Sequence, residues 1–195
     1  MQSIVFFGLP GSIAALACLA LSGCASVAIE AVNVAADKVS VTTNLDDALG
    51  GDPDAQFAVG EALCCSGDAA TGTLYNTTEA ITWLCRSAEQ GNTDAMQKLG
   101  QIFEGDQVDG LRILRRAFTA TQETPKNPAA AYFWYAKAGA SGEIDGAETA
   151  RALYETLSLA ERDTAARYFD GAPAPCEWND LAQTIAPSSD ARPSQ

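Results

Sequence analysis

One twelve-residue stretch occurs twice in this chain, and its repetition constrains the fold more than any other feature. Residues 80–91 and residues 131–142 both follow the pattern Ala-x-x-Trp-[Leu/Tyr]-x-[Arg/Lys]-[Ser/Ala]-[Ala/Gly]-x-x-Gly. A single unit of this length cannot bury its apolar face alone, whereas stacked copies can. The repetition therefore predicts an array of stacked helical hairpins.

A second pattern precedes each copy and places a glycine in the middle of a predicted helix. Gly60 and Gly100 sit at the same step of this pattern, where glycine costs roughly 1 kcal/mol relative to alanine. A cost repeated at one register predicts a close contact with a neighbouring helix, with Trp83, Trp134 and Tyr135 filling the space around it. The apolar positions recur at every fourth residue, on one face of a helix: Ala55, Val59 and Leu63, then Ala95, Leu99 and Phe103.

The two patterns together resemble the Sel1-like repeat family, which is related to the tetratricopeptide repeats. The resemblance covers residues 52–142 and extends more loosely to about residue 170. It implies an all-α fold, a short α-solenoid of stacked antiparallel hairpins. The chain departs from the family pattern in the loops within its units, slightly between residues 67 and 80 and strongly between residues 105 and 131.

The array is expected to occupy residues 51–172. Its predicted units span residues 52–91, residues 92–142 with an inserted loop at 105–127, and a degenerate terminal unit at 143–171. Helix starts are predicted from cap signals at Asp52-Pro53, Asn76, Asn127-Pro128 and the Ser158-x-x-Glu161 capping box. Residues 24–50, rich in β-branched valine and threonine, are interpreted as a tether with a short helix near 46–49. Residues 173–195 are expected to form a strap and a disordered tail.

The first 23 residues carry no charge and end in Leu21-Ser22-Gly23-Cys24. This ending resembles the lipobox of bacterial lipoproteins, which implies a cleaved signal peptide at 1–23 and acylation of Cys24. The resemblance places the chain in the bacterial envelope. Ala25, rather than aspartate, after the cysteine favours the outer membrane, facing the periplasm. The segment lacks a basic residue, and an uncleaved anchor helix is the alternative, although Pro10 interrupts the apolar run.

Four cysteines remain in the mature chain, an even number in an oxidising compartment, and they allow three pairings. In a hairpin, Cys65 lies level with about Thr77, so Cys85 lies about 12 Å further along the neighbouring helix. That distance is too long for a disulfide, and Cys64 is little better placed. Cys176 is therefore expected to reach back to a cysteine of the first unit or its neighbour. Buried free thiols are the alternative, and a zinc site is disfavoured because the chain has no histidine.

Composition excludes several classes of function. Without histidine the chain cannot carry a Ser-His-Asp or Cys-His catalytic arrangement, and no glycine-rich phosphate loop is present. A net charge of -13 and a pI near 4.2 argue against nucleic acid as a partner. We therefore expect no enzymatic activity, no metal and no cofactor other than the lipid on Cys24.

The remaining class is a protein that binds other proteins. In helical arrays the first helices of the units line a concave surface, so a protein or peptide partner is expected there. The candidate contact residues are the polar positions of these helices that packing does not use, with solvated side chains as the simpler interpretation: Gln56, Glu61, Gln97, Gln101 and Glu104.

Three arginines of the inserted loop form a separate candidate, namely Arg112, Arg115 and Arg116. They are either the solvated side of a short amphipathic helix or a contact patch for an anionic partner or lipid headgroups.

Two other functions are considered. One is an envelope enzyme or cell-wall-binding protein similar to cysteine-rich, β-lactam-binding Sel1-like proteins. In those proteins the cysteine spacing repeats with the unit, and here it does not; hydrolysis of nitrocefin would favour this function. The other is a structural lipoprotein that spaces the envelope. The sequence identifies neither the partner nor the oligomeric state.

Overall fold

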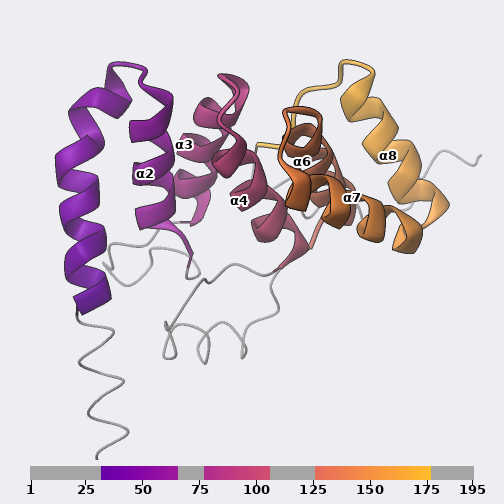
Figure 1. Cartoon of the computed structure of the whole chain (residues 1–195), viewed down its shortest axis with the longest axis horizontal. Coiled ribbons are helices and arrows are strands. Elements are labelled where there is room, and N and C mark those ends of the chain that lie inside the picture. Colours follow the sequence, from indigo (N-terminus) through magenta and orange to yellow (C-terminus); the bar gives the residue numbers. More distant parts are fainter. Residues whose placement is uncertain (1–31, 66–76, 106–125, 177–195) are drawn as a thin grey trace, which may run out of the picture.

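The computed structural model describes residues 32–65, 77–105 and 126–176, and all regular elements within these ranges are helices. Residues 32–49 form the N-terminal helix. It is followed by α2 (Pro53–Leu63), α3 (Thr77–Glu89), α4 (Thr93–Glu104), α6 (Pro128–Ala140), α7 (Ile144–Thr156) and α8 (Leu159–Phe169). They follow one another in chain order across Figure 1. Among the described helices, none combines the length and the apolar character needed to cross a membrane.

The helices begin at the residues that the cap signals predict. Asp52 accepts a hydrogen bond from the amide of Ala55 at 2.8 Å, and Asn127 accepts one from the amide of Ala130 at 3.0 Å. Ser158 and Glu161 form the reciprocal capping box at the start of α8. These side chains satisfy amides that the first turn of a helix leaves without a partner. The predicted helix starts at Asp52, Asn127 and Ser158 are confirmed.

Two hairpins form the body of the array, and a glycine lies at the contact within each. α2 packs against α3, α4 packs against α6, and α3 lies beside α4 between the hairpins. A Cβ atom added to Gly60 would lie 2.7 Å from Cγ of Leu84, and one added to Gly100 would lie 2.6 Å from Cε1 of Tyr135. Leu84 and Tyr135 follow the two tryptophans at the same step of the repeat. The prediction of close contacts at both glycines is confirmed.

The N-terminal helix corrects the prediction of a tether over residues 24–50. Its described part runs without a break from 32 to 49 and packs along the first hairpin, where Ala48 is 1% exposed and Val41 contacts the core. The hydroxyl of Ser40 donates to the carbonyl of Ala58 at 3.5 Å. Burial against α2 outweighs the modest helix propensity of valine and threonine, because tertiary packing supplies most of a helix's stability.

The terminal unit differs from the two hairpins, as the sequence predicts. α7 lies so close to α6 that a Cβ atom on Gly139 would be 2.7 Å from Cα of Ala147. α8 does not close a hairpin with α7 but packs against α6. The contacts are aromatic: the Phe169 ring lies 5.0 Å from that of Phe133 and 6.1 Å from that of Tyr132. The array therefore ends in a helix pair whose last member crosses back over α6.

Candidate functional site

Four of the five residues predicted on the first helices of the units lie at the surface. Glu61 and Glu104 are exposed, and Gln97 and Gln101 are half-buried. Gln97, Gln101 and Glu104 are spaced by four and three residues along α4, which places them on one stripe of that helix. Glu61 occupies on α2 the position that Gln101 occupies on α4, and the two helices contact each other. These four residues are called the A-helix face below.

Gln56 is not part of this face. It is 5% exposed, and its amide nitrogen donates to the carbonyl of Ala48 at 3.1 Å while its amide oxygen accepts from Gln90 at 2.8 Å. It thus joins the N-terminal helix to the turn that follows α3. The equivalent position on α4 is Met96, which is 3% exposed, so this step of the repeat packs inward in both units. Aligning the two units would have revealed this from the sequence.

Glu104 has a defined orientation on the A-helix face. Its carboxylate accepts a hydrogen bond from the Tyr135 hydroxyl at 3.0 Å. The same Tyr135 ring fills the space at Gly100. The residue that closes the second hairpin therefore also positions an acidic side chain at the surface, which is a connection that the sequence does not indicate.

Cation–ring contacts support the second helix of each unit. The guanidinium of Arg86 lies 4.8 Å from the centre of the Trp83 ring, and the ammonium of Lys137 lies 5.7 Å from that of Trp134. Both cations stand three residues after the tryptophan, the spacing that brings side chains together on a helix. The [Arg/Lys] position of the repeat is thus explained by packing on its own helix.

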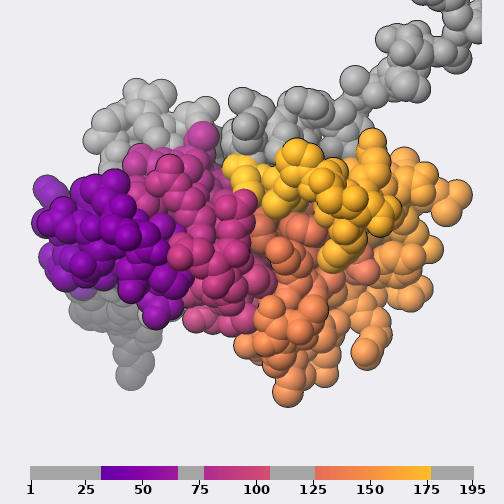
Figure 2. Space-filling view, turned by 90° about the horizontal axis from the view of Figure 1, so that it is seen from above, coloured from indigo at the N-terminus to yellow at the C-terminus, as the bar shows by residue number. Residues whose placement is uncertain are grey.

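The C-terminal strap, residues 170–176, connects the two hairpins on the side of α3 and α6. A disulfide joins Cys85 of α3 to Cys176, with the Cα atoms 5.9 Å apart. The expectation that Cys176 reaches back to the first unit is confirmed, with Cys85 as its partner. Cys64 and Cys65 are also joined to each other. In Figure 2 the yellow strap extends from the orange part of the molecule onto the magenta part.

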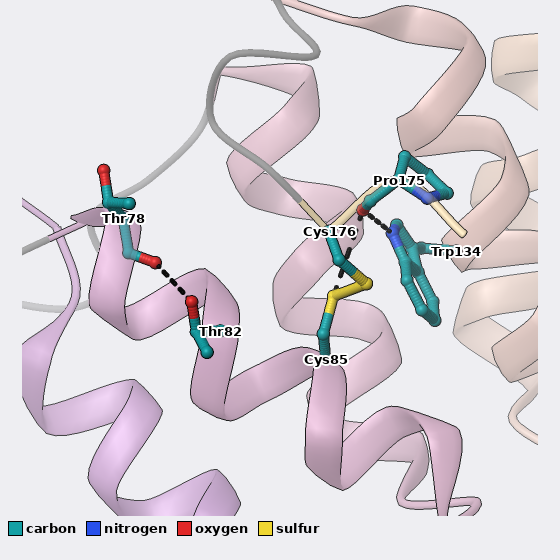
Figure 3. Close-up of a disulfide and its surroundings, with 6 residues drawn as sticks. All are labelled: Thr78, Thr82, Cys85, Trp134, Pro175 and Cys176. Carbon is teal, nitrogen blue, oxygen red and sulfur yellow. Dashed lines mark hydrogen bonds between the residues drawn. A yellow bond between two sulfur atoms is a disulfide. The ribbon is translucent and has the colours of Figure 1, made fainter. Parts of the chain in front are cut away.

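Trp134 fixes the strap at a second point. Its indole nitrogen donates to the carbonyl of Pro175 at 3.1 Å, and Trp134 itself is fully buried (Figure 3). Pro175 is buried too, so the strap is anchored in the core at this residue. One strap residue is thus bonded to the tryptophan helix of the second unit and the next to that of the first.

Several predicted residues lie outside the described residues. They are Cys24 with the preceding signal segment, and the arginines of the inserted loop, Arg112, Arg115 and Arg116. Within the described residues, no three cysteine or carboxylate side chains come together in a way that could hold a metal ion. The described part presents the A-helix face on a body of two packed hairpins.

Comparison with protein families gives a match. The family model described as Sel1 repeat matches residues 53–92 and 121–143. The first match covers α2 and α3, and the second includes all of α6. No curated protein and no solved structure matches the chain.

Proposed function

This chain is a Sel1-repeat protein, and we propose that it is a lipid-anchored scaffold of the bacterial envelope that binds a protein or peptide through its A-helix face. Sel1 repeats generally mediate protein–protein interaction. The proposal adds three particulars: the anchor, the face and the chemistry of the partner. It assigns the chain no catalytic step.

The observation that carries the proposal is that the two hairpins use equivalent positions in the same way. In both units the apolar and small residues are used for packing between helices, and so are the equivalent residues Gln56 and Met96. The A-helix face, Glu61, Gln97, Gln101 and Glu104, belongs to the surface of these helices that packing leaves available. Its two carboxylates and two amides, in a chain of net charge -13, suit a basic or hydrogen-bonding segment of a partner.

The anchor rests on the sequence around Cys24. An apolar segment, small residues and a cysteine coincide there, and acylation at several positions holds a protein firmly to a membrane. Replacing Cys24 by Ser should move the protein from the membrane fraction to the soluble fraction and abolish incorporation of a labelled fatty acid. Retention of both properties in the Cys24→Ser protein would remove the anchor from the proposal without affecting the binding face.

Crosslinking in intact cells followed by mass spectrometry tests the binding face. We expect a partner that is recovered with the native chain and lost with Gln97→Lys/Gln101→Lys, because two added positive charges repel a basic segment. The control is Ala160→Lys/Asp163→Asn on exposed α8 positions, which changes the net charge by the same amount. Equal recovery with all three proteins would place the contact elsewhere.

A further inference from the structure

A groove of about 350 Å³ runs along the junction of α6 and α7. Its floor consists of small side chains, and two tyrosines and an arginine stand at its rim. The part of α6 that lines it, from Tyr132 to Ala140, is about 12 Å long, or roughly two helical turns. We call it the α6–α7 groove and define it by Tyr132, Ala136, Ala147, Ala150, Arg151 and Tyr154.

The repeat register explains why the groove is open. Gly146 of α7 corresponds to Ala95 of α4, so Ala150, Arg151 and Tyr154 correspond to Leu99, Gly100 and Phe103. In the second unit these three positions are buried, because α6 packs against α4 and Tyr135 fills the space at the glycine. In the terminal unit Tyr154 is 38% exposed and Arg151 is exposed.

α8 does not occupy the equivalent place on α7. It crosses α6 at the Tyr132 end of the groove and contacts α7 through Arg162, which donates to the carbonyl of Tyr154 at 3.1 Å. Arg151 gives a physical reason, because it stands where the other units have glycine. A helix packed there as closely as α6 on α4 would bury the guanidinium without a counter-charge, which is costly.

These observations lead to a specific occupant. We propose that the α6–α7 groove binds an amphipathic helix of a partner protein, with large apolar side chains on the alanine floor and a carboxylate against Arg151. The hairpin of α4 and α6 shows that a helix fits against this position of the repeat. Arg151 stands where α4 has Gly100, which indicates that the partner's helix must carry a negative charge there. Arg151 is exposed at the rim of the groove, where its guanidinium can meet a partner's carboxylate.

The aromatic rim adds selectivity for a helix over an extended peptide. The rings of Tyr132 and Tyr154 lie 5.2 Å apart and close one end of the groove together with Phe169. Large rings at one end and alanines along the rest match a helix that presents one apolar side chain per turn. This second surface is independent of the A-helix face, because none of its residues belongs to α2 or α4.

The array's own α6 provides the probe. A hydrocarbon-stapled peptide of residues 127–142 carrying Tyr135→Glu places a carboxylate at the position that faces Arg151, and its Tyr135→Lys counterpart places an ammonium there. The staple is needed because isolated helices of this length are marginal in water. Fluorescence anisotropy with the purified full-length protein, disulfides intact, measures both affinities.

We expect saturable binding of the Glu peptide and at least about tenfold weaker binding of the Lys peptide. Arg151→Glu should reverse this preference, and Ala136→Phe should weaken both peptides by filling the floor. The control Arg167→Glu makes the same charge change at an exposed residue of α8 and should leave both affinities unchanged. Circular dichroism of each variant verifies that it is folded.

Three results would overturn the proposal. They are no saturable binding of the Glu peptide, equal affinity for both peptides, or an Arg151→Glu protein that still prefers the Glu peptide. Sedimentation showing a dimer that Arg151→Glu dissociates would identify a second copy as the occupant instead. A tenfold gain in peptide affinity on deletion of residues 177–195 would identify the chain's own C-terminal segment. None of these results depends on the A-helix face.

Discussion

At the scale of single residues, Gly60 and Gly100 tell the most about how the helices pack. Each leaves a notch in its helix that a side chain of the next helix fills, and they are called the notch glycines below. Gly60 and Gly100 are poor helix formers, and the structure explains their position by contacts of 2.7 Å and 2.6 Å that any Cβ atom would make. The sequence predicts these contacts because the same cost appears twice at one register. The inward position of Gln56 is missed because an amide is usually a surface residue, although the alignment of Gln56 with Met96 indicates a buried step.

Gly100→Ala is expected to destabilise the protein by up to about 2 kcal/mol. Alanine gains roughly 1 kcal/mol in helix propensity, whereas forcing a methyl group against the Tyr135 ring costs about 1–3 kcal/mol. Urea unfolding monitored by circular dichroism measures the difference, with Gln101→Ala as the control at the neighbouring half-buried position. A Gly100→Ala protein more stable than the native one would mean that the notch is not tightly filled.

At the scale of helices, cap signals predict where elements start, whereas propensity fails for the N-terminal helix. Its valines and threonines disfavour a solvated helix, but Asp37, Val41 and Ala48 lie at spacings of four and seven residues and turn toward the first hairpin. The tether is predicted from the valine and threonine content of residues 24–50, whereas the spacing of the buried residues is the stronger signal for a helix. The open face of α7 has a comparable signal, the replacement of the notch glycine by Arg151, which only alignment of a third unit reveals.

The contact between α6 and α7 should tolerate an added methyl group less well than the contacts at Gly60 and Gly100 do. A Cβ atom on Gly139 would meet the backbone Cα atom of Ala147, which can yield only if the whole helix moves. We expect Gly139→Ala to lower the free energy of unfolding by about 2–3 kcal/mol, the upper part of the range for overpacking.

Hydrogen exchange checks this expectation at the level of the helix. In Gly139→Ala the amides of α7 should lose protection while those of α2 and α3 keep it, and Ala140→Ser at the next exposed position should change neither. Loss of protection spread evenly over all helices would show that α7 is not the element displaced.

At the scale of the whole molecule, hairpin order follows from the repeats, and the route of the strap does not. The sequence indicates that Cys176 returns to the array, since the other pairings span too far along a helix. It cannot choose the partner, because that depends on where the chain runs after α8. The crossing of α8 over α6 brings Pro175 to Trp134 and Cys176 to Cys85. The A-helix face is similar: the repeat identifies its helices, and packing decides which polar residues remain outside.

Removing the long disulfide should destabilise the array clearly. Cys85 and Cys176 are 91 positions apart, so their bond closes a long loop, and removing a native disulfide from a small domain costs about 2–5 kcal/mol. We expect Cys85→Ser/Cys176→Ser to lower the unfolding free energy by that amount in urea titrations. Cys64→Ser/Cys65→Ser is the control, because adjacent residues enclose no long loop. Equal losses in the two double variants would contradict this role, and peptide mapping without reductant verifies the pairing.

The bond between Cys85 and Cys176 also determines which part of the chain carries mechanical tension. A helical solenoid held at one end and pulled at the other stretches along its entire length. Here a pull between the N-terminal helix and the residues beyond Cys176 passes from α3 directly through the two sulfur atoms. The segment from α4 to α8 lies between the bonded cysteines and bears no load, so its surfaces would keep their shape while the two ends of the chain are pulled apart.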